Sequence, residues 1–432
     1  MNNREIIQES IDYIESNLKT EIAAQELSDM AGFSLFHYYR LFQSATGMPV
    51  FQYITHRKLI HAIYEIRCGR KMVDVALEYG FDTYAGFYRA FKREFGCTPS
   101  AFLKHYNVKK PYQIHLLEEE HIMLSHKKIA EILKHWNLEN ESISDVYYKG
   151  SGNRNDNAYY VGDEFIIKFT ANLGKLTNHI QLSKSLENVG LYAATPIKTT
   201  DNEDYIHDGE LYFCLTNRLE GSEIVTRDMY EGDYKTKARF VGEIIGQLHE
   251  ALKNADALVN DTNLYESVVN WAIPKTKELL GLSDELCKDY TDNFGKRFET
   301  LPTQIIHRDP NPGNIILNKD KWGFIDFELS ERNLRIFDPC YAATAILSES
   351  FSEGNADKLE QWIEIYQNII YGYDSVATLS QDERTAIPYV ILSNQLVSVA
   401  WFAEQDKYKD IFETNIKMTK WIVEHFDQLR ME

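Results

Sequence analysis

The pattern of apolar and polar positions predicts a helical first quarter of the chain followed by a mixed remainder. Over residues 22–31 and 72–79, apolar side chains recur every three to four positions, as on one face of an amphipathic helix. From residue 145 the pattern changes to short runs rich in β-branched and aromatic residues, DVYYKG, NAYYVG and EFIIKF, which predict strands. Helical periodicity dominates again beyond about residue 220. This order predicts an all-α domain followed by an α+β domain.

A sequence repeat organises residues 1–108. The segment AGFS, beginning at residue 31, recurs as YGFD at residue 79, an offset of 48. Further along, RLF at residue 40 recurs as RAF at residue 89, an offset of 49, so the second copy holds one extra residue. Because a repeat constrains the whole fold, each copy is expected to form the same unit of helix, tight turn and helix.

Glycines and small polar residues mark the turn in each copy. Gly32 and Gly80 suit a tight turn, since a positive φ costs glycine little. Ser34 and Asp82 then precede the second helices, and their side-chain oxygens are expected to cap the first backbone N–H groups.

The matched repeat, closed by GCTPSAFL, resembles the paired helix-turn-helix domain of the AraC family of bacterial transcription regulators. The resemblance covers nearly all of residues 4–106, and it implies that the second helix of each copy enters the major groove of double-stranded DNA. The second copy offers few side chains for bidentate bonds to bases, which favours contacts to phosphates and to DNA shape. Carried over by position, the residues expected to face DNA are Phe36, Tyr39 and Arg40 in the first copy and Tyr84, Ala85, Gly86 and Arg89 in the second.

Charge separates the same two parts of the chain. Residues 1–110 hold 14 Lys and Arg against 12 Asp and Glu, a net charge of +2, and the other 322 residues carry −21. The small positive charge predicts only modest non-specific affinity for DNA. The acidic body would repel nucleic acid and suits a cationic small molecule as its ligand.

Composition narrows the class of protein further. A hydrophobic content of 44% and an aromatic content of 13% indicate a globular protein. The five cysteines are scattered and never form a C-x-x-C pair, which argues against a disulfide framework or a zinc site and for a cytoplasmic location. No apolar run approaches the ~18 residues of a membrane span, so no membrane partner is expected.

A glycine-rich loop lies between the first two strand-like runs of the second domain. GSGNRNDN, residues 150–157, has the composition of a loop that covers nucleotide phosphates and donates backbone N–H groups to them. Lys168 lies in the third run, among apolar residues where an ammonium group needs a partner. Glycine-rich hairpins and strand lysines are common, so these two features gain meaning only beside a second motif downstream.

The stretch IIHRDPNPGNIIL places a polar loop between two strand-like runs. His307, Asp309 and Asn314 follow the spacing H-x-D-x-x-x-x-N, and Asp326 lies twelve residues further on in WGFIDFE. Phosphoryl transfer requires a carboxylate beside the acceptor hydroxyl, ligands for Mg²⁺ and a cation on the α- and β-phosphates. Asp309 is expected to be the base or orienting group, Asn314 and Asp326 the metal ligands, and Lys168 the phosphate-binding cation.

This ordered set of motifs resembles the protein-kinase-like fold and, within it, the aminoglycoside phosphotransferase and choline kinase families. The resemblance covers roughly residues 122–432, with TNRLEG similar to the hinge between lobes and EIIGQLHEAL similar to the Leu-His helix. It implies ATP or GTP and Mg²⁺ as cofactors, and structural roles for His307 and for Asp338 of FDP. The nucleotide-binding residues that it implies are Gly150, Ser151, Gly152, Asn153, Lys168, Thr216, Asn217 and Arg218.

Two positions depart from the pattern of these families. The helix expected to supply a glutamate partner for Lys168 reads LTNHIQLSKSLENVG, and its nearest candidates by spacing are His179 and Gln181. Glu328 stands where glycine often follows Asp-Phe, a departure that choline kinases tolerate.

The chain is therefore expected to be a multidomain protein, an all-α double helix-turn-helix domain followed by an α+β two-lobed protein-kinase-like domain. The expected function is a DNA-binding transcription regulator fused to a kinase that transfers the γ-phosphate of ATP or GTP to a hydroxyl group of a small molecule. The alternatives are a kinase-like domain that only senses a nucleotide or small ligand, and an antibiotic-modifying enzyme. The expected segments are residues 1–108 (helix-turn-helix), 109–123 (linker) and 124–432 (kinase-like), with the small lobe at about 124–216 and the large lobe at about 217–432.

Overall fold

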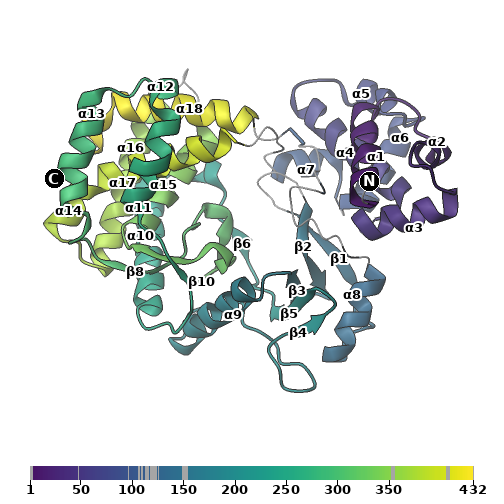
Figure 1. The fold of residues 1–432 in the computed structure, drawn as a ribbon, viewed down its shortest axis with the longest axis horizontal. Helices are drawn as coiled ribbons and strands as arrows, with labels where there is room; N and C mark the ends of the chain where they lie inside the picture. Colours follow the sequence, from purple (N-terminus) through teal and green to yellow (C-terminus); the bar gives the residue numbers. More distant parts are fainter. Residues whose placement is uncertain are drawn as a thin grey trace. The chain divides into compact units, whose positions relative to one another are not determined.

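The computed structural model of this chain divides into two compact units (Figure 1). Unit 1 comprises Met1–Ala171 and Ile197–Asn217, and unit 2 comprises Asn172–Pro196 and Arg218–Glu432. The last passage of the chain from unit 1 to unit 2 therefore falls inside TNRLEG, the segment predicted as a hinge. The structure describes residues 3–431 except 47, 96, 106–107, 109, 112–115, 117–123, 125, 148–153, 352–355 and 405–408, so most of the predicted linker lies outside it.

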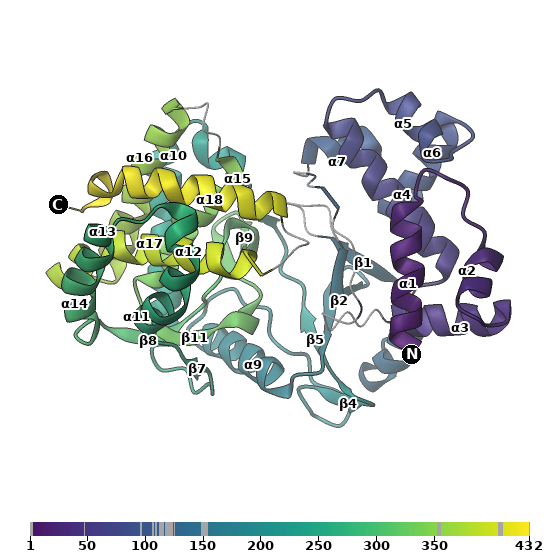
Figure 2. The same cartoon turned by 45° about the horizontal axis from the view of Figure 1, so that its top comes forward.

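The first part of unit 1, within the described residues, consists of seven helices around one apolar cluster. The long helix α4 contacts α3, α5, α6 and α7, and thereby joins the two repeats (Figure 2). Their bounds are α1 (Asn3–Ser16), α2 (Ala24–Met30), α3 (Leu35–Thr46), α4 (Val50–Arg67), α5 (Met72–Glu78), α6 (Tyr84–Phe95) and α7 (Pro99–His105). The predicted pairs of helices are thus α2 with α3 and α5 with α6, and we call α3 and α6 the reading helices.

The extra residue of the second repeat lies in its turn. Gly32 and Gly80 have φ values of 71° and 80°, so both turns use the positive φ predicted for them. In the second turn Thr83 is the residue before α6, and its Oγ1 accepts a hydrogen bond from Gly86 N–H at 3.0 Å. The cap predicted at Asp82 was wrong, because the inserted residue takes that role.

In the first turn the predicted cap is confirmed. Ser34 precedes α3, and its Oγ accepts a hydrogen bond from His37 N–H at 3.4 Å. The two reading helices therefore start from equivalent caps, although the turns before them differ in length by one residue.

The second part of unit 1 is an antiparallel sheet with strand order β1-β2-β3-β5-β4. Helix α8 (His126–Leu133) and the 3-10 turn η1 (Lys134–Trp136) share an apolar cluster with the sheet. The indole Nε1 of Trp136 donates a hydrogen bond to Ile197 O at 2.7 Å. The strands are β1 (Ile143–Tyr147), β2 (Arg154–Val161), β3 (Phe165–Thr170), β4 (Ile206–Asp208) and β5 (Leu211–Asn217). Residues 154–157, predicted as loop, already belong to β2.

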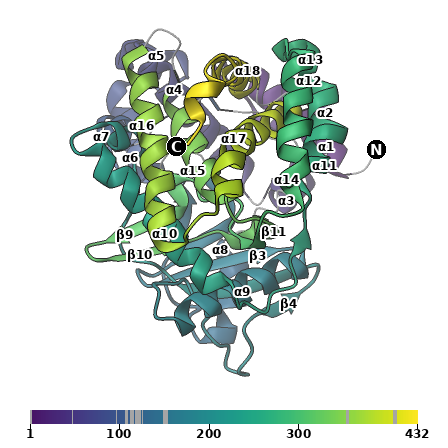
Figure 3. The same cartoon turned by 90° about the vertical axis from the view of Figure 1, so that its left-hand side faces the viewer.

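Unit 2 is mainly helical, and its described residues also form two small sheets of order β10-β9-β6 and β7-β11-β8. Helices α10, α15, α16 and α17 pack together (Figure 3). The helices are α9 (Leu173–Asn188), α10 (Tyr234–Leu252), α11 (Leu264–Ser267), α12 (Ile273–Leu280), α13 (Asp284–Asp289), α14 (Lys296–Phe298), α15 (Phe337–Ser350), α16 (Ala356–Val376), α17 (Gln381–Phe402) and α18 (Lys409–Glu424). The strands are β6 (Ser222–Glu223), β7 (Asn260–Asp261), β8 (Thr303–Ile306), β9 (Ile315–Asn318), β10 (Lys321–Phe324) and β11 (Glu331–Leu334). The 3-10 and π segments are η2 (Thr226–Tyr230), η3 (Val268–Ala272), η4 (Tyr290–Gly295), η5 (Pro312–Asn314), η6 (Phe327–Leu329) and η8 (Phe426–Leu429).

Glycines bring α10 and α16 close together. A Cβ added at Gly242 would lie 1.9 Å from Ile369 O, and a Cβ added at Gly372 would lie 1.9 Å from Arg239 O. Both positions therefore require glycine for the approach of the two backbones.

Helix α17 is long and apolar enough to cross a membrane by length and composition, with a mean hydropathy of 1.2 over its best window. The helix is not an uninterrupted apolar run, since Ser393, Asn394 and Gln395 lie in its middle. In addition, 72% of that window is buried inside the structure, as in the core helix of a globular protein.

Candidate active site

The residues predicted for catalysis lie in one loop of unit 2 that follows a buried strand. Strand β8 pairs with β11 in antiparallel register, and its last residues, Ile305 and Ile306, are buried. The chain then enters residues 307–314, which we call the HxD loop, and continues through η5 into β9. A loop fixed at both ends by paired strands in this way has a rigid base.

His307 is fully buried and holds the loop from within. Its Nε2 lies 2.9 Å from Ile325 O, and its Nδ1 accepts a hydrogen bond from Asp309 N–H at 3.3 Å. Since a carbonyl can only accept and an N–H can only donate, the ring is the neutral tautomer with its proton on Nε2. The rings of Phe324 and Phe327 flank it at centroid distances of 5.6 Å and 4.7 Å. These contacts are those of a structural group.

Asp338 fixes the start of the loop from the first turn of α15. It is fully buried, and its Oδ2 and Oδ1 accept hydrogen bonds from the N–H groups of His307 at 2.8 Å and Arg308 at 3.0 Å. Its Oδ2 also lies 2.9 Å from Nε2 of His249. The partial positive charge of a helix N-terminus further favours this carboxylate. One side chain therefore sets the direction of two successive peptide units.

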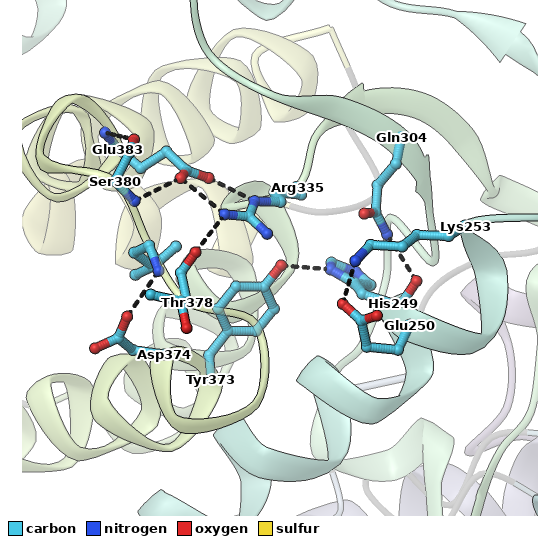
Figure 4. A network of polar contacts seen from close by, with 11 residues as sticks. His249, Glu250, Lys253, Gln304, Arg335, Tyr373, Asp374, Thr378, Ser380 and Glu383 are labelled. Atoms are coloured by element: carbon cyan, nitrogen blue, oxygen red, sulfur yellow. Dashed lines mark hydrogen bonds and ion pairs between the residues drawn. The ribbon is translucent and has the colours of Figure 1, made fainter.

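His249 links this carboxylate to two more elements (Figure 4). Its Nδ1 lies 2.8 Å from the Tyr373 hydroxyl on α16, and its backbone carbonyl accepts a hydrogen bond from Gln304 Nε2 at 3.1 Å. Burial raises the pKa of Tyr373, so the hydroxyl stays protonated and donates to His249. The predicted Leu-His helix, α10, thus supports the loop through its histidine.

Arg335, just before α15, ties the loop's scaffold to α17 (Figure 4). Its Nε and Nη2 donate to the two carboxylate oxygens of Glu383 at 2.6 Å and 2.8 Å, and Nη2 also donates to Thr378 O at 2.8 Å. Glu383 in turn completes a capping box with Ser380 at the start of α17. A bidentate pair of this kind fixes both position and angle.

Asp309 is held by two side-chain amides. Its Oδ1 accepts a hydrogen bond from Asn311 Nδ2 at 2.9 Å, and its Oδ2 accepts one from Asn314 Nδ2 at 3.1 Å. Burial and the nearby carboxylate of Asp309 raise the pKa of the Tyr341 hydroxyl on α15. Burial raises the pKa of Asp309, the hydrogen bond from Asn311 opposes that rise, and the nearby charge of Asp326 adds to it. The carboxylate is therefore oriented before any substrate arrives.

Sequence reasoning missed Asn311 and Tyr341. Asn311 also caps η5, with its Oδ1 accepting from Gly313 N–H at 2.9 Å, and the run Pro-Asn-Pro-Gly was the signal for such a turn. Tyr341 lies one helical turn after the predicted Asp338, so helix periodicity would have placed both on one face.

Asp326 and Asn314 come together through the backbone. Ile325 N–H donates a hydrogen bond to Asn314 O at 3.0 Å. Asp326 directly follows Ile325, so this bond holds Asp326 close to Asn314. Asp326 has a φ of 69°, an uncommon conformation for a residue other than glycine, at the junction between β10 and η6. The amide nitrogen of Asn314 is turned toward Asp309, which leaves its oxygen on the other side of the group.

The donor chemistry of this pair fits a magnesium ion. A carboxylate and an amide oxygen are hard ligands, and Mg²⁺ usually takes one or two protein ligands and completes its octahedron with water and phosphate oxygens. Among the residues that the structure describes, no group of three or more His, Cys, Asp or Glu side chains gathers to hold a metal. A two-ligand magnesium site is compatible with that finding.

Arg308 occupies a strained position beside Asp309. Its φ is 76°, a region that favours glycine, and the side chain is only 24% exposed. The guanidinium Nε lies 2.8 Å from Glu331 Oε1, and its carbon lies 4.2 Å from the centre of the Phe337 ring. Strain that persists in a well-packed setting is typical of functional loops.

The residues predicted to bind nucleotide are divided between the units. In unit 1, Lys168 lies on β3 opposite Ala158 and Cys214, and Thr216 is buried near the end of β5. Arg218 is exposed at the start of the second segment of unit 2, directly after Asn217 at the end of unit 1. Gly150, Ser151, Gly152 and Asn153 lie outside the described residues.

Helix α9 holds His179 and Gln181, the two candidates predicted to stand in place of the glutamate of these kinase families. His179 is 4% exposed, and its ring lies 6.2 Å from that of Phe327 in η6, the turn that comes directly after Asp326. Gln181 is exposed. Both lie in unit 2, whereas Lys168 lies in unit 1.

The residues predicted to face DNA lie on outward surfaces of α3. Phe36 is 72% exposed and Arg40 is exposed, whereas Tyr39 is half-buried, with its ring 6.1 Å from that of Phe51. The opposite face of this helix, which includes Tyr38, is buried in the apolar cluster.

Helix α6 shows the same division. Ala85 and Arg89 are exposed, and Tyr84 and Gly86 are half-buried. The ring of Tyr84 lies 6.3 Å from that of the buried Phe87, so Tyr84 partly supports the core of the domain.

Comparison with known proteins assigns each part to a family. A helix-turn-helix domain model matches residues 27–105, and a model described as the phosphotransferase enzyme family matches residues 149–378. The HTH-type transcriptional activator AarP of Providencia stuartii is 32% identical over 98 residues, which cover 22% of this chain and 73% of that protein. The uncharacterized HTH-type transcriptional regulator YbfP of Bacillus subtilis is 34% identical over 108 residues, 24% of this chain and 37% of that protein.

Solved structures share the fold of the second part. The microcompartment-associated aminopropanol kinase superposes with a TM-score of 0.53 at 14% identity, covering 70% of this chain and 98% of that one. The amicoumacin kinase hAmiN, in complex with AMP-PNP, Ca²⁺ and Ami, gives 0.51 at 15% identity, covering 68% and 91%. The predicted fold class, a helical domain followed by an α+β kinase-like domain, is confirmed.

Proposed function

The chain belongs to the phosphotransferase enzyme family and carries a helix-turn-helix domain of the transcription-regulator type, and from this we propose a specific division of labour. The HxD loop transfers the terminal phosphoryl group of a magnesium-bound ATP or GTP to a hydroxyl group of a small molecule. The reading helices bind double-stranded DNA. Both activities belong in the cytoplasm, in keeping with five free cysteines.

The observation that carries the proposal is the fixed orientation of Asp309. Asn311 and Asn314 direct their amide donors at its carboxylate, which has about four lone-pair sites in total. The remaining acceptor capacity suits the hydroxyl of a substrate. A carboxylate held in this way orients the hydroxyl for attack, which is the main task of the protein in phosphoryl transfer.

The proposed transfer forms one bond, breaks one bond and moves one proton. The hydroxyl oxygen forms a bond to the terminal phosphorus, and the bond from that phosphorus to the bridging oxygen of the nucleotide breaks, releasing a nucleoside diphosphate. Asp309 accepts the hydroxyl proton and returns it to solvent. His307 and Asp338 keep the loop in place and take no part in the proton transfer.

Asp326 and the amide oxygen of Asn314 are the proposed metal ligands. A magnesium ion held there supplies charge neutralisation for the phosphate oxygens. In unit 1, the ammonium group of Lys168 and the loop of residues 150–153 are the proposed phosphate-binding groups. Backbone atoms of Thr216, Asn217 and Arg218 are the proposed contacts of the nucleotide base.

The substrate of the proposed kinase is a small molecule with a hydroxyl group. The net charge of −21 beyond residue 110 suits a cationic one. Two kinases that share the fold are named for aminopropanol and for amicoumacin, so a screen should include amino alcohols, amicoumacin and aminoglycosides.

The Asp309→Asn variant tests the proposal. It keeps the size of the side chain and removes the base, so we expect turnover with magnesium and nucleotide to fall by at least about 100-fold. Nucleotide binding, measured by calorimetry, and DNA binding should stay within about twofold of the original protein. Asp320→Asn, on the exposed turn between β9 and β10, is the matched control and should leave turnover unchanged.

Two outcomes would contradict the proposal. Turnover that survives Asp309→Asn would exclude the mechanism. Binding of magnesium-ATP or magnesium-GTP without any phosphorylated product, across a broad panel of hydroxyl compounds, would identify the domain as a ligand sensor instead.

A further inference from the structure

The two reading helices present the same faces when aligned at the repeat offset. At an offset of 49 residues, Tyr38 corresponds to Phe87 and Phe42 corresponds to Phe91, and all four side chains are fully buried. The capping hydrogen bonds also correspond, since each is accepted by the residue just before the helix. The exposed positions of α3 and α6 can therefore be compared one by one.

The second residue of each reading helix is an exposed apolar side chain. Phe36 is 72% exposed, the highest value among the large apolar side chains described in the helical part of unit 1, and its counterpart Ala85 is also exposed. Most of the phenyl ring therefore lies outside the apolar cluster behind it. Single exposed apolar side chains are common on protein surfaces, but these two lie at matched positions near the start of helices proposed to enter the major groove, where they are available for apolar contacts with bases.

One helical turn further on, each reading helix carries an exposed arginine. Arg40 and Arg89 follow Phe36 and Ala85 at a spacing of four residues, so on each helix the apolar side chain and the arginine lie on one face. Each helix thus exposes an apolar side chain followed, one turn later, by a guanidinium group.

This pair matches a particular chemistry in the major groove. Thymine is the one base that presents a methyl group there, and alanine and phenylalanine side chains are its usual apolar partners. Arginine binds guanine edges or phosphates. Gly86, directly after Ala85, has no side chain, so the backbone of α6 can approach the DNA closely enough for the short methyl group of alanine to reach.

We infer that each reading helix recognises a thymine through its 5-methyl group, by Phe36 in α3 and by Ala85 in α6. The inference rests on the proposed DNA binding and adds the identity of one base for each half-site. The second repeat was expected to favour contacts with phosphates and DNA shape. By this inference it also recognises one base directly, through Ala85.

The test begins with the full chain and a pool of random duplex DNA. After selection of a bound sequence, each thymine is replaced in turn by deoxyuridine, which removes the 5-methyl group and nothing else. Binding is measured at one fixed salt concentration, because phosphate contacts make affinity strongly salt-dependent. We expect a loss of about fourfold at one thymine in each half-site, the effect of one buried methyl group.

Protein variants then assign each thymine to a helix. With Phe36→Ala, the deoxyuridine effect should disappear at one thymine and persist at the other, and Ala85→Gly should show the opposite pattern. This double comparison isolates the contact from general weakening. Leu77→Ala is the matched control, since this α5 side chain is 51% exposed and apolar but lies outside the reading helices, and it should preserve both effects.

The possible outcomes distinguish a failure of thymine recognition from a failure of DNA binding itself. If no duplex is enriched, DNA binding itself is excluded and the inference falls with it. If a duplex is enriched but every deoxyuridine effect is the same in the original protein and in both variants, DNA binding stands and the thymine contacts are excluded. Circular dichroism of each variant shows whether the helices remain folded.

Discussion

In the HxD loop the proposed catalytic side chain is held by its neighbours, whereas the side chains that face outward on the reading helices extend into solvent. The Asp309 carboxylate accepts hydrogen bonds from two side-chain amides, and His307 and Asp338 are buried within the scaffold. Phe36 is 72% exposed, and Arg40 is exposed beside it. The difference reflects the two tasks. A reacting group must be fixed before the substrate arrives, whereas a reader of DNA must leave its contacts uncovered.

The largest expected effect comes from removing the carboxylate that fixes the loop. Asp338→Ala leaves two backbone N–H groups and His249 without their acceptor, and should lower the free energy of unfolding by about 4 kcal/mol. Turnover should be lost even at temperatures where unit 2 remains folded, while DNA binding is retained. Urea unfolding and a kinase assay measure the two effects.

Asp374→Ala provides the control for this variant. Asp374 (Figure 4) accepts a hydrogen bond from Leu379 N–H at 2.7 Å. It also accepts one from Arg384 Nη2 at 2.6 Å, so its loss also destabilises unit 2 but removes no hydrogen bond of the HxD loop. Equal loss of turnover in both variants would show that Asp338 acts only through stability.

A buried ion pair joins α1 and α4 in the helical part of unit 1. Arg57 of α4 donates to both oxygens of Glu15 of α1, at 2.5 Å and 2.8 Å, with both side chains buried. Glu15→Gln removes the charge that Arg57 requires, so we expect a loss of about 3 kcal/mol in the free energy of unfolding of this part. Glu9→Gln, exposed on α1, is the control.

The same pair predicts an acid dependence of stability. Burial raises the pKa of Glu15, but hydrogen bonds from His61 and Arg57 outweigh it and hold the pKa below its ordinary value of 4.5. Because the folded pKa is depressed, the stabilisation is complete above pH 4.5 and is lost as the pH falls through the folded value. Unfolding curves from neutral pH down to acid pH should show a larger loss in the original protein than in Glu15→Gln, in which other carboxylates such as Glu65 and Glu78 still lose their pairing in acid.

A smaller effect is expected at Arg308. Glycine there relieves a positive φ, worth about 1 kcal/mol, and removes an ion pair worth about the same, so stability should hardly change. Turnover should fall about tenfold, because the loop loses its contacts with Glu331 and Phe337. Lys319→Gly, also at a positive φ but on an exposed turn, should leave turnover intact, and a fall in both variants would point to loop flexibility in general.

The smallest effect is expected at Phe36. Since the ring lies in solvent, Phe36→Ala should change the free energy of unfolding by less than about 0.5 kcal/mol, although it weakens DNA binding. Phe42→Ala, fully buried on the same helix, should cost about 3–5 kcal/mol. A large loss at Phe36 would mean that the ring supports the domain, which would remove the contrast between the two regions.

Much of the fold and part of the candidate site could be predicted from the sequence. The spacing of His307, Asp309 and Asn314 indicated the loop because these residues are close along the chain. The proximity of Tyr341 to Asp309 could not be predicted, because it depends on how α15 packs against the loop. The link from His249 to Asp338 spans 89 positions for the same reason.

The prediction of the second helix cap was wrong because the second repeat has one inserted residue. The match at an offset of 48 aligns Asp82 with Ser34 and predicts it as the cap, but the extra residue, Thr83, stands next to α6 and accepts the capping hydrogen bond. A pattern match gives the register of a repeat only up to the insertion. Beyond it, the backbone decides which side chain reaches the helix end.

The position of the HxD loop depends on the close packing of α16 against α10 at Gly372. The hydrogen atom at its α-carbon is what lets α16 lie against Arg239 O of α10. The next residue, Tyr373, holds His249, which holds Asp338, which holds the loop. A single methyl group at Gly372 would push the two helices apart, and that displacement would be transmitted through these hydrogen bonds to the HxD loop and the proposed catalytic carboxylate of Asp309.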